Sequence, residues 1–235
     1  MSRSAAPAPP RPTVAAVVPA RNEARTVGAV VYAALDSRLV DEVVVVDNGS
    51  ADGTAAVAAA HGARVVHEPT PGKGEAMRAG VAATDAGVVV FLDADLVGLR
   101  PGHIDELVCA VLSGDADMAC GLFDRGPLAN RIFLEGLPVL TGQRALPRHL
   151  FERLDLGDVR GYRVEAALNS LVARDDLVRC DRVLPGLWHR TKEEKAANPV
   201  VGFATKVAML LSACWSYARF ALARRALSPA PASAS

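Results

Sequence analysis

The sequence has few of the residues that mark several common classes of protein. Its 235 residues include only four cysteines, and none forms a CxxC pair. They are Cys109, Cys120, Cys180 and Cys214. We therefore expect reduced thiols in a cytoplasmic protein, with neither a disulfide framework nor a zinc site. The 26 basic and 26 acidic side chains give a formal net charge of zero. This balance argues against a nucleic-acid-binding protein that covers phosphates with a basic face.

Two nucleotide-binding motifs and a signal peptide are also missing. The chain has no GxxxxGK[ST] P-loop, and no GxGxxG follows an apolar run, so a nicotinamide cofactor is not expected. Residues 1–12, MSRSAAPAPPRP, lack the apolar core of a signal peptide. Because residues 1–12 and 227–235 are rich in proline and alanine, we expect both to be disordered tails.

Apolar runs and segments with helical periodicity alternate along the first half of the chain. Strands are expected at 13–20, 42–47, 63–68 and 88–92, and helices at about 23–39, from the turn 48–54 to about 62, and at 72–84. Because each of these strands is apolar throughout, they indicate a parallel sheet covered on both faces. The predicted fold class is α/β, a mostly parallel sheet flanked by helices.

The second half is less regular and ends in an amphipathic segment. We expect a helix around 104–112, a strand at 117–123, a helix at 161–173, a strand at 178–184 and a last amphipathic helix over 196–226. The longest uncharged run of that last helix, 207–218, is shorter than the ~20 residues that span a bilayer. The helix is expected either to pack on the domain, with a homodimer as one form of packing, or to lie peripherally in a membrane interface.

Two aspartates separated by one alanine follow the strand at 88–92. Side chains alternate along a strand, so Asp93 and Asp95 are expected on the same side, where their charges repel unless a cation lies between them. Magnesium and manganese are usually held by one or two carboxylates, with substrate phosphates supplying further oxygens. The pair therefore predicts a metal delivered with a phosphorylated substrate, and a solvated aspartate-rich turn is the alternative.

Two further polar groups are expected at the same edge of the sheet, where ligands of α/β folds bind. Gly72 and Lys73, in PGKGEA, offer backbone NH groups and a cation to a phosphate, although an ordinary exposed turn would look the same. Asp47 is placed to bind a ribose or base, or instead to cap the turn that follows it. Together these groups indicate a nucleoside-diphosphate donor with a divalent metal.

Four motifs in order carry a resemblance to a known family. VVPARNEARTVGAVV, VVVVDNGSADGTAAVA, GKGEAMRAG and VVFLDADL closely resemble the donor-binding half of the family 2-type glycosyltransferases with the GT-A fold, over residues 13–97. A weaker likeness runs through LTGQRALPR, GYRVEAAL and LWHR within residues 98–195, the implied acceptor half. That half is similar to the glucosyl-3-phosphoglycerate synthase and mannosylglycerate synthase branch, and to polyprenyl-phosphate sugar transferases.

The resemblance implies a role for each matching residue. The donor nucleotide would lie against Pro19, Ala20, Arg21, Glu23, Asp47, Gly72, Lys73, Asp93 and Ala94. The ligands of a Mg²⁺ or Mn²⁺ ion would be Asp93, Asp95 and His189, with Asp95 the more direct one and part of the catalytic group. The acceptor would contact Gly142, Gln143, Arg144 and Tyr162, with Arg144 meeting a phosphate or carboxylate in bidentate fashion. Glu165 would orient the acceptor or act as a general base, and a solvated helix face is its alternative.

The resemblance further implies a metal-dependent transfer of a sugar from a nucleoside-diphosphate sugar, UDP being favoured over GDP, to a hydroxyl or phosphate acceptor. Transfer to a polyprenyl phosphate at the membrane surface is one alternative, and a non-catalytic nucleotide-sugar binding protein is another. Two residues depart from the glucosyl-3-phosphoglycerate synthase pattern. Leu187 stands where that family has an arginine before the metal histidine, and Arg163 replaces a glycine. Both departures argue against assuming a phosphoglycerate acceptor.

Overall fold

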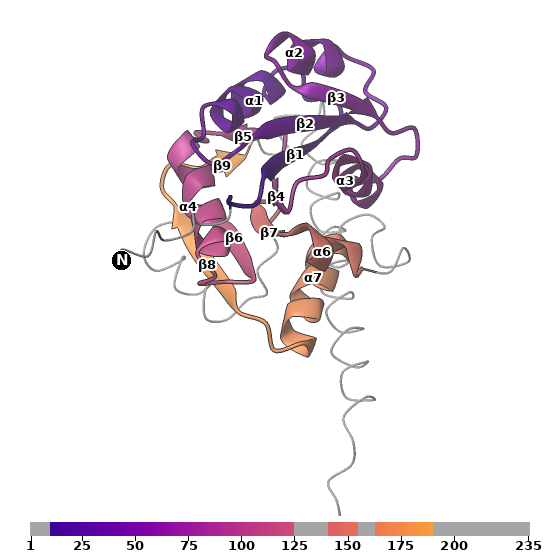
Figure 1. The fold of residues 1–235 in the computed structure, drawn as a ribbon. Helices are drawn as coiled ribbons and strands as arrows, with labels where there is room; N and C mark the ends of the chain where they lie inside the picture. Colours follow the sequence, from indigo (N-terminus) through magenta and orange to yellow (C-terminus); the bar gives the residue numbers. More distant parts are fainter. Residues whose placement is uncertain (1–9, 125–140, 155–162, 190–235) are drawn as a thin grey trace, which may run out of the picture.

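A computed structural model describes residues 10–124, 141–154 and 163–189 of the chain (Figure 1). Tyr162, Cys214, most of the first tail, the predicted helix at 196–226 and the tail at 227–235 lie outside the described residues. In chain order the elements are β1 (Val14–Ala20), α1 (Val27–Leu35), β2 (Glu42–Asp47), α2 (Thr54–Ala60), β3 (Arg64–His67), α3 (Lys73–Ala82), β4 (Val88–Phe91), β5 (Leu96–Val97), α4 (Pro101–Leu112), β6 (Met118–Phe123), β7 (Arg144–Pro147), α6 (Arg148–Glu152), α7 (Arg163–Arg174), β8 (Arg179–Leu184) and β9 (Trp188–His189).

Seven of the strands form one mostly parallel sheet, in the order β3-β2-β1-β4-β7-β6-β8. The first four strands in this order are parallel to one another, and β6 is parallel to β8. Strand β7 runs antiparallel to both of its neighbours, β4 and β6. The α/β fold class is therefore confirmed, but the sequence analysis missed β7 and the two-residue strands β5 and β9, which pair with each other.

Helices cover both faces of this sheet. In Figure 1, α1 and α4 lie on one side, and α3, α6 and α7 lie on the other. Along β2 the side chains alternate between the two cores: Val43 and Val45 join the α1 and α4 side, and Val44 and Val46 join the α3 and α7 side. This alternation, with apolar residues in both directions, is why the strand is hydrophobic at every position.

Helix α1 is shorter than the predicted 23–39 because its two ends are used elsewhere. A turn precedes it, in which the backbone NH of Val27 donates to the carbonyl of Glu23 over 2.9 Å. Beyond its end, the Ser37 hydroxyl donates to Asp105 of α4 over 2.6 Å, and the NH of Arg38 donates to the same carboxylate oxygen over 3.1 Å. The chain therefore leaves the helix axis at residue 36 and ties α1 to α4.

The three described cysteines are free thiols, with Cys120 buried and Cys109 exposed. No disulfide joins them, in agreement with the expectation of reduced thiols for this part of the chain. Within the same described residues, every helix is too short or too polar to cross a bilayer.

Candidate active site

Two loops at the carboxyl ends of β1 and β2 are fastened to each other. Asn22 adopts a left-handed conformation, with φ of 57°, and its side-chain oxygen accepts a hydrogen bond from the NH of Ala51 over 2.8 Å. In return, the NH of Asn22 donates to Ser50 over 3.0 Å, and the NH of Glu23 donates to the Thr54 hydroxyl over 2.8 Å. Asparagine tolerates the left-handed region better than most residues, so this turn holds the loop after β1 beside the end of β2.

Asp47, predicted to bind the nucleotide, has two neighbours within the protein. It is buried at the end of β2, and one carboxylate oxygen accepts a hydrogen bond from the NH of Ser50 over 3.1 Å. The other oxygen lies 3.4 Å from Nδ1 of His67, at the end of β3. The structure thus shows the turn-capping role that the sequence left open, while contact with a ribose or base stays a prediction.

Asn48 holds in place the loop between β3 and α3, which contains Gly72. This role was not predicted from the sequence. Its side-chain NH₂ donates to the carbonyls of Glu68 and Thr70 over 2.9 and 2.7 Å. Its side-chain oxygen accepts from the NH of Gly72 over 2.8 Å. The position directly after a buried strand is the one signal that could have identified it, because polar groups at strand ends gather at this edge.

Lys73 is the centre of the candidate site. Its ammonium lies 2.7 Å from Oδ1 of Asp93 and 2.8 Å from Oε1 of Glu165, so that one cation joins the turn after β4 to the first turn of α7. Burial opposes the charge on Lys73, but the two carboxylates outweigh it and raise the pKa of the ammonium above its ordinary value. The same burial opposes ionisation of Asp93, yet the attraction of Lys73 holds the pKa of this carboxyl below its usual value. Lys73 and Asp93 are therefore both charged at neutral pH.

The cation that the structure shows beside Asp93 is the Lys73 ammonium, which lies between Asp93 and Glu165, and a metal held by Asp93 and Asp95 stays a prediction. The strand β4 ends at Phe91, so both aspartates belong to the turn between β4 and β5 and not to a strand end. The alternation of a strand consequently does not place them on one side, and the argument that used it was wrong. Lys73, expected at the diphosphate or base, lies next to Asp93, and its contact with a donor stays a prediction.

Gly142 and Gln143 lie behind Asp93, on the side away from solvent. Gln143 is fully buried and donates from Nε2 to Oδ2 of Asp93 over 2.7 Å. A Cβ atom on Gly142 would stand 2.2 Å from the same carboxylate oxygen, so only glycine leaves room for it. Both residues were predicted to contact the acceptor, but the structure engages Gln143 with Asp93.

Gly142→Ala is therefore expected to push the Asp93 carboxylate out of its position and to lower both donor affinity and the unfolding temperature. Overpacking of this kind typically costs about 1–3 kcal/mol. Gly102→Ala, at a helical site with open space around it, is the matched control and should change stability little. Equal unfolding temperatures of the two variants in a thermal melt would contradict this placement of Asp93.

Arg144 begins strand β7 and is fully buried, whereas the sequence analysis placed it in an acceptor loop. Its guanidinium donates to the Thr141 carbonyl over 2.6 Å from Nη2 and reaches the Glu165 carbonyl and the Asn169 side chain, each 3.5 Å from Nη1. With these contacts, Arg144 braces the start of α7, which carries Glu165. Direct contact between Arg144 and an acceptor would require this brace to open.

His189 is brought next to the aspartate turn by the small sheet of β5 and β9. Leu96 pairs with His189 in this sheet, so the histidine lies beside the residue that follows Asp95. The imidazole ring also lies against the Phe123 ring, with centroids 4.9 Å apart. The described residues contain no cluster of three histidine, cysteine, aspartate or glutamate side chains that could hold a metal unaided.

This donor set nevertheless fits a divalent ion that arrives with a diphosphate. Magnesium sites usually have one or two protein carboxylates and take their other oxygens from substrate phosphates and water. Both oxygens of Asp93 already have partners: Oδ1 pairs with the Lys73 ammonium, and Oδ2 accepts a hydrogen bond from Gln143. Asp95, the more direct ligand by the family resemblance, and His189 stay predicted metal ligands, and imidazole is compatible with manganese.

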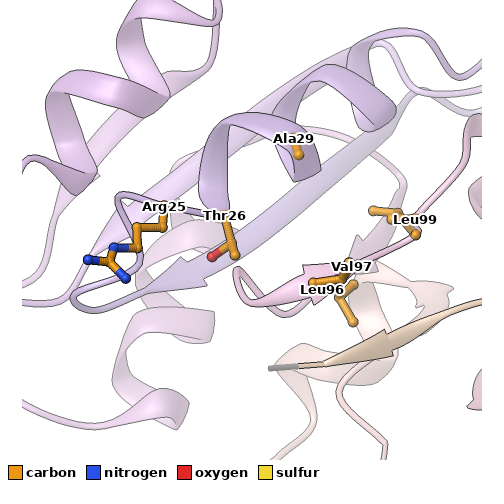
Figure 2. Close-up of a pocket in the computed structure, with 7 residues that line it drawn as sticks. Arg25, Thr26, Ala29, Leu96, Val97 and Leu99 are labelled. Carbon is orange, nitrogen blue, oxygen red and sulfur yellow. The ribbon is translucent and has the colours of Figure 1, made fainter. Parts of the chain in front are cut away.

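A pocket of about 210 Å³ lies between the start of α1 and strand β5 (Figure 2). It is lined by Arg25, Thr26, Ala29, Leu96, Val97, Gly98 and Leu99. Figure 2 shows the apolar side chains of β5 and the following loop facing α1 across it. None of the predicted site residues lines this pocket, although Leu96 follows Asp95 directly.

The remaining predicted residues lie along the same edge. Pro19 and Ala20 end β1, Arg21 and Glu23 follow it, and Ala94 is buried between the two aspartates. Ala20 and Asp47 are register partners in β1 and β2, which brings the first two loops together. Leu187, one of the two departures, is 1% exposed and packs in the core shared with α1 and α4.

The fold is of the GT-A nucleotide-binding type. It has a mostly parallel sheet with polar loops at its carboxyl edge, and an aspartate turn followed by a small second sheet. The model of the family "Glycosyl transferase family 2" matches residues 15–167, and the chain belongs to this family.

Curated relatives and solved structures agree with this assignment. The chain is 40% identical over 142 residues to a glucosyl-3-phosphoglycerate synthase of Mycobacterium tuberculosis (strain CDC 1551 / Oshkosh), covering 56% of this chain and 44% of that protein. It therefore spans less than half the length of this relative. It is 38% identical over 160 residues to an uncharacterized glycosyltransferase of Mycobacterium bovis (strain ATCC BAA-935 / AF2122/97), covering 66% of this chain and 70% of that protein.

Among solved structures, a glucosyl-3-phosphoglycerate synthase from Mycobacterium tuberculosis in complex with Mn²⁺, UDP-glucose and phosphoglyceric acid superimposes with a TM-score of 0.66 at 30% identity. The match covers 76% of this chain and 72% of that one. A structure of the synthase from the same organism with Mg²⁺ and UDP matches with the same TM-score, 0.66, at 30% identity, over 84% of this chain and 79% of that one.

Proposed function

We propose that this chain transfers a sugar from a nucleoside-diphosphate sugar, UDP being the favoured nucleotide, to a hydroxyl or phosphate acceptor, with Mg²⁺ or Mn²⁺. The observation that carries the proposal is the ion-pair cluster of Lys73, Asp93 and Glu165 at the carboxyl edge of the sheet. Perturbed charged groups in such a position are typical of functional sites. Family membership and the UDP complexes of the structural relatives support the same reading.

The geometry supports the following role for each residue. Asp95 and His189 would hold the metal, which when bound neutralises charge on the diphosphate as the sugar–phosphate bond breaks. Gly72, fixed by Asn48, presents its loop to the diphosphate at the start of α3. The ion pair of Lys73 and Asp93 lies next to this loop.

We infer that Glu165 interacts with the acceptor hydroxyl. Its Oε1 accepts from Lys73, while Oε2 is buried and has no hydrogen-bond partner among the described residues. An unsatisfied buried carboxylate oxygen is costly, by about 1–3 kcal/mol, so a hydroxyl donor is strongly favoured there. Glu165 would orient that hydroxyl and accept its hydrogen bond, as a general base does.

The proposal specifies the acceptor only by its reacting group, a hydroxyl or a phosphate. Phosphoglyceric acid is bound in a relative's structure, and Leu187, at a departure from that relative's pattern, is buried in the core. A polyprenyl phosphate acceptor, peripheral membrane contact and a homodimer depend on residues 196–226, so they remain predictions.

Calorimetric titration with UDP and with GDP tests the proposal. With Mn²⁺ present, UDP is expected to bind and GDP to bind more weakly, and EDTA should weaken the UDP binding by about tenfold or more. Failure of both nucleotides to bind in the presence of Mn²⁺ would remove the donor and, with it, the proposed transfer.

A further inference from the structure

Gln143 is the only glutamine in the chain, and it is wholly buried. Its side chain donates to Oδ2 of Asp93 over 2.7 Å, while the Lys73 ammonium lies 2.7 Å from Oδ1. Each oxygen of the carboxylate is thus held by a different donor, one from the interior and one from α3. A carboxylate fastened at both oxygens has no rotational freedom about its last bond, so its plane is fixed.

The amide of Gln143 is itself held in one orientation. The Thr141 hydroxyl lies 2.6 Å from Oε1 of Gln143 and 2.6 Å from the carbonyl of Gly121 in β6. A carboxylate only accepts hydrogen bonds, so Gln143 must turn its NH₂ toward Asp93 and leave its oxygen to Thr141. The backbone carbonyl of Gln143 also accepts from the NH of Gly121 over 2.9 Å. The sheet therefore supports Asp93 from behind.

A neutral amide suits this position because of the charges around it. Lys73 supplies one positive charge to the two carboxylates, Asp93 and Glu165. A third carboxylate beside Asp93 would add repulsion to a cluster that already has two carboxylates on one ammonium, and an apolar side chain would leave Oδ2 without its donor. Glutamine supplies a donor without adding charge.

We propose that Gln143 is a positioning residue for sugar transfer, which fixes the Asp93 carboxylate and, through it, the Lys73 ammonium, without touching donor or acceptor. This inference rests on the proposed function and replaces the acceptor contact predicted for Gln143. Because Gln143 lies behind the site, its loss should misalign the reacting groups more than it weakens donor binding.

The first test replaces Gln143 with methionine, which keeps volume and burial but removes the NH₂. With a UDP-sugar donor, kcat is expected to fall by about tenfold or more, while the donor KM changes by less than about threefold. The unfolding temperature should fall somewhat, because Oδ2 of Asp93 loses its buried donor. If Gln143 only filled space, Gln143→Met would keep the wild-type kcat, and this result would overturn the inference.

The second test is a double-mutant cycle read by thermal unfolding, which needs no activity. Gln143→Glu places two carboxylates together and should lower the unfolding temperature. Adding Asp93→Asn lets the new amide donate to Glu at 143, which reverses the hydrogen bond and should restore part of the loss. No recovery in the double variant would show that the two side chains are not coupled. If the wild-type protein transfers no sugar, the proposed function fails, while this cycle still decides whether Gln143 holds Asp93.

Discussion

Replacing Lys73 with methionine is expected to lower the free energy of unfolding by about 3 kcal/mol at neutral pH, because it leaves Asp93 and Glu165 without the cation between them. The Lys73 side chain is 22% exposed and the Glu165 side chain only 6% exposed, so solvent screens this loss little. Sugar transfer should fall on the order of 100-fold. Denaturant unfolding and initial rates measure the two effects.

Arg78→Met, on the same helix, is the matched control. Arg78 pairs with Glu75, but its side chain is 46% exposed, and exposed pairs contribute about 0–1 kcal/mol. The control should therefore unfold close to the wild type. Equal loss of stability in the Lys73 and Arg78 variants would contradict the central position of Lys73.

The pH dependence of the Lys73→Met effect has a definite sign. The pKa of Asp93 is lowered in the folded wild type, so its contribution to stability is present above the unfolded value, about 4, and is lost as pH falls through the folded value. The pKa of Lys73 is raised, so its contribution is present below about 10.4 and is lost only as pH rises through the folded value. Between these limits the wild type has the full contribution.

In the variant, two uncompensated carboxylates should take up protons more readily as pH falls. The stability gap between wild type and Lys73→Met should consequently narrow between pH 7 and pH 4. Unfolding free energies measured across this range, with Arg78→Met alongside, give the comparison. A difference in unfolding free energy that is constant with pH would mean that repulsion between Asp93 and Glu165 does not cause the instability of the variant.

Strands with two buried faces are the easiest to find in the sequence. Strands β1, β2 and β4 are apolar at nearly every position because helices cover both sides, so their hydrophobic runs are visible in the sequence. Strand β7 is just as central, between β4 and β6. Its four residues begin with a charged side chain and end in proline, and neither is typical of a central strand.

In the candidate site, likewise, some features could be predicted from the sequence and others could not. Asp93, Lys73 and Glu165 could be selected from their motifs, but their contact could not, since Lys73 and Glu165 are 92 residues apart in the chain. A buried arginine such as Arg144 is also beyond sequence reasoning, because this residue type is almost never fully buried unless paired. Chain topology, which brings β7 and α7 against β4, makes these contacts.

The two aspartates of the DAD motif have different roles in the proposed site, because Asp93 contacts Lys73 and Gln143 and Asp95 is the proposed metal ligand, so their substitutions should have different effects. Asp95→Ala is expected to abolish the metal-dependent part of UDP binding, lowering the affinity in Mn²⁺ by about tenfold or more, as EDTA does, with a smaller change in stability than Asp93→Ala. Asp93→Ala should chiefly destabilise the fold, because it leaves Lys73 with one partner and Gln143 without an acceptor.

Calorimetry of UDP with Mn²⁺ and with EDTA, together with thermal unfolding, measures both variants. His189→Ala is the companion variant, since its backbone pairing with Leu96 places it beside the same turn, and it should also reduce the effect of Mn²⁺. An Asp95→Ala protein whose UDP affinity still rises with Mn²⁺ would remove Asp95 from the metal site. The metal would then have to compete with Lys73 and Gln143 for Asp93, and Asp93→Ala would become the variant that loses metal dependence.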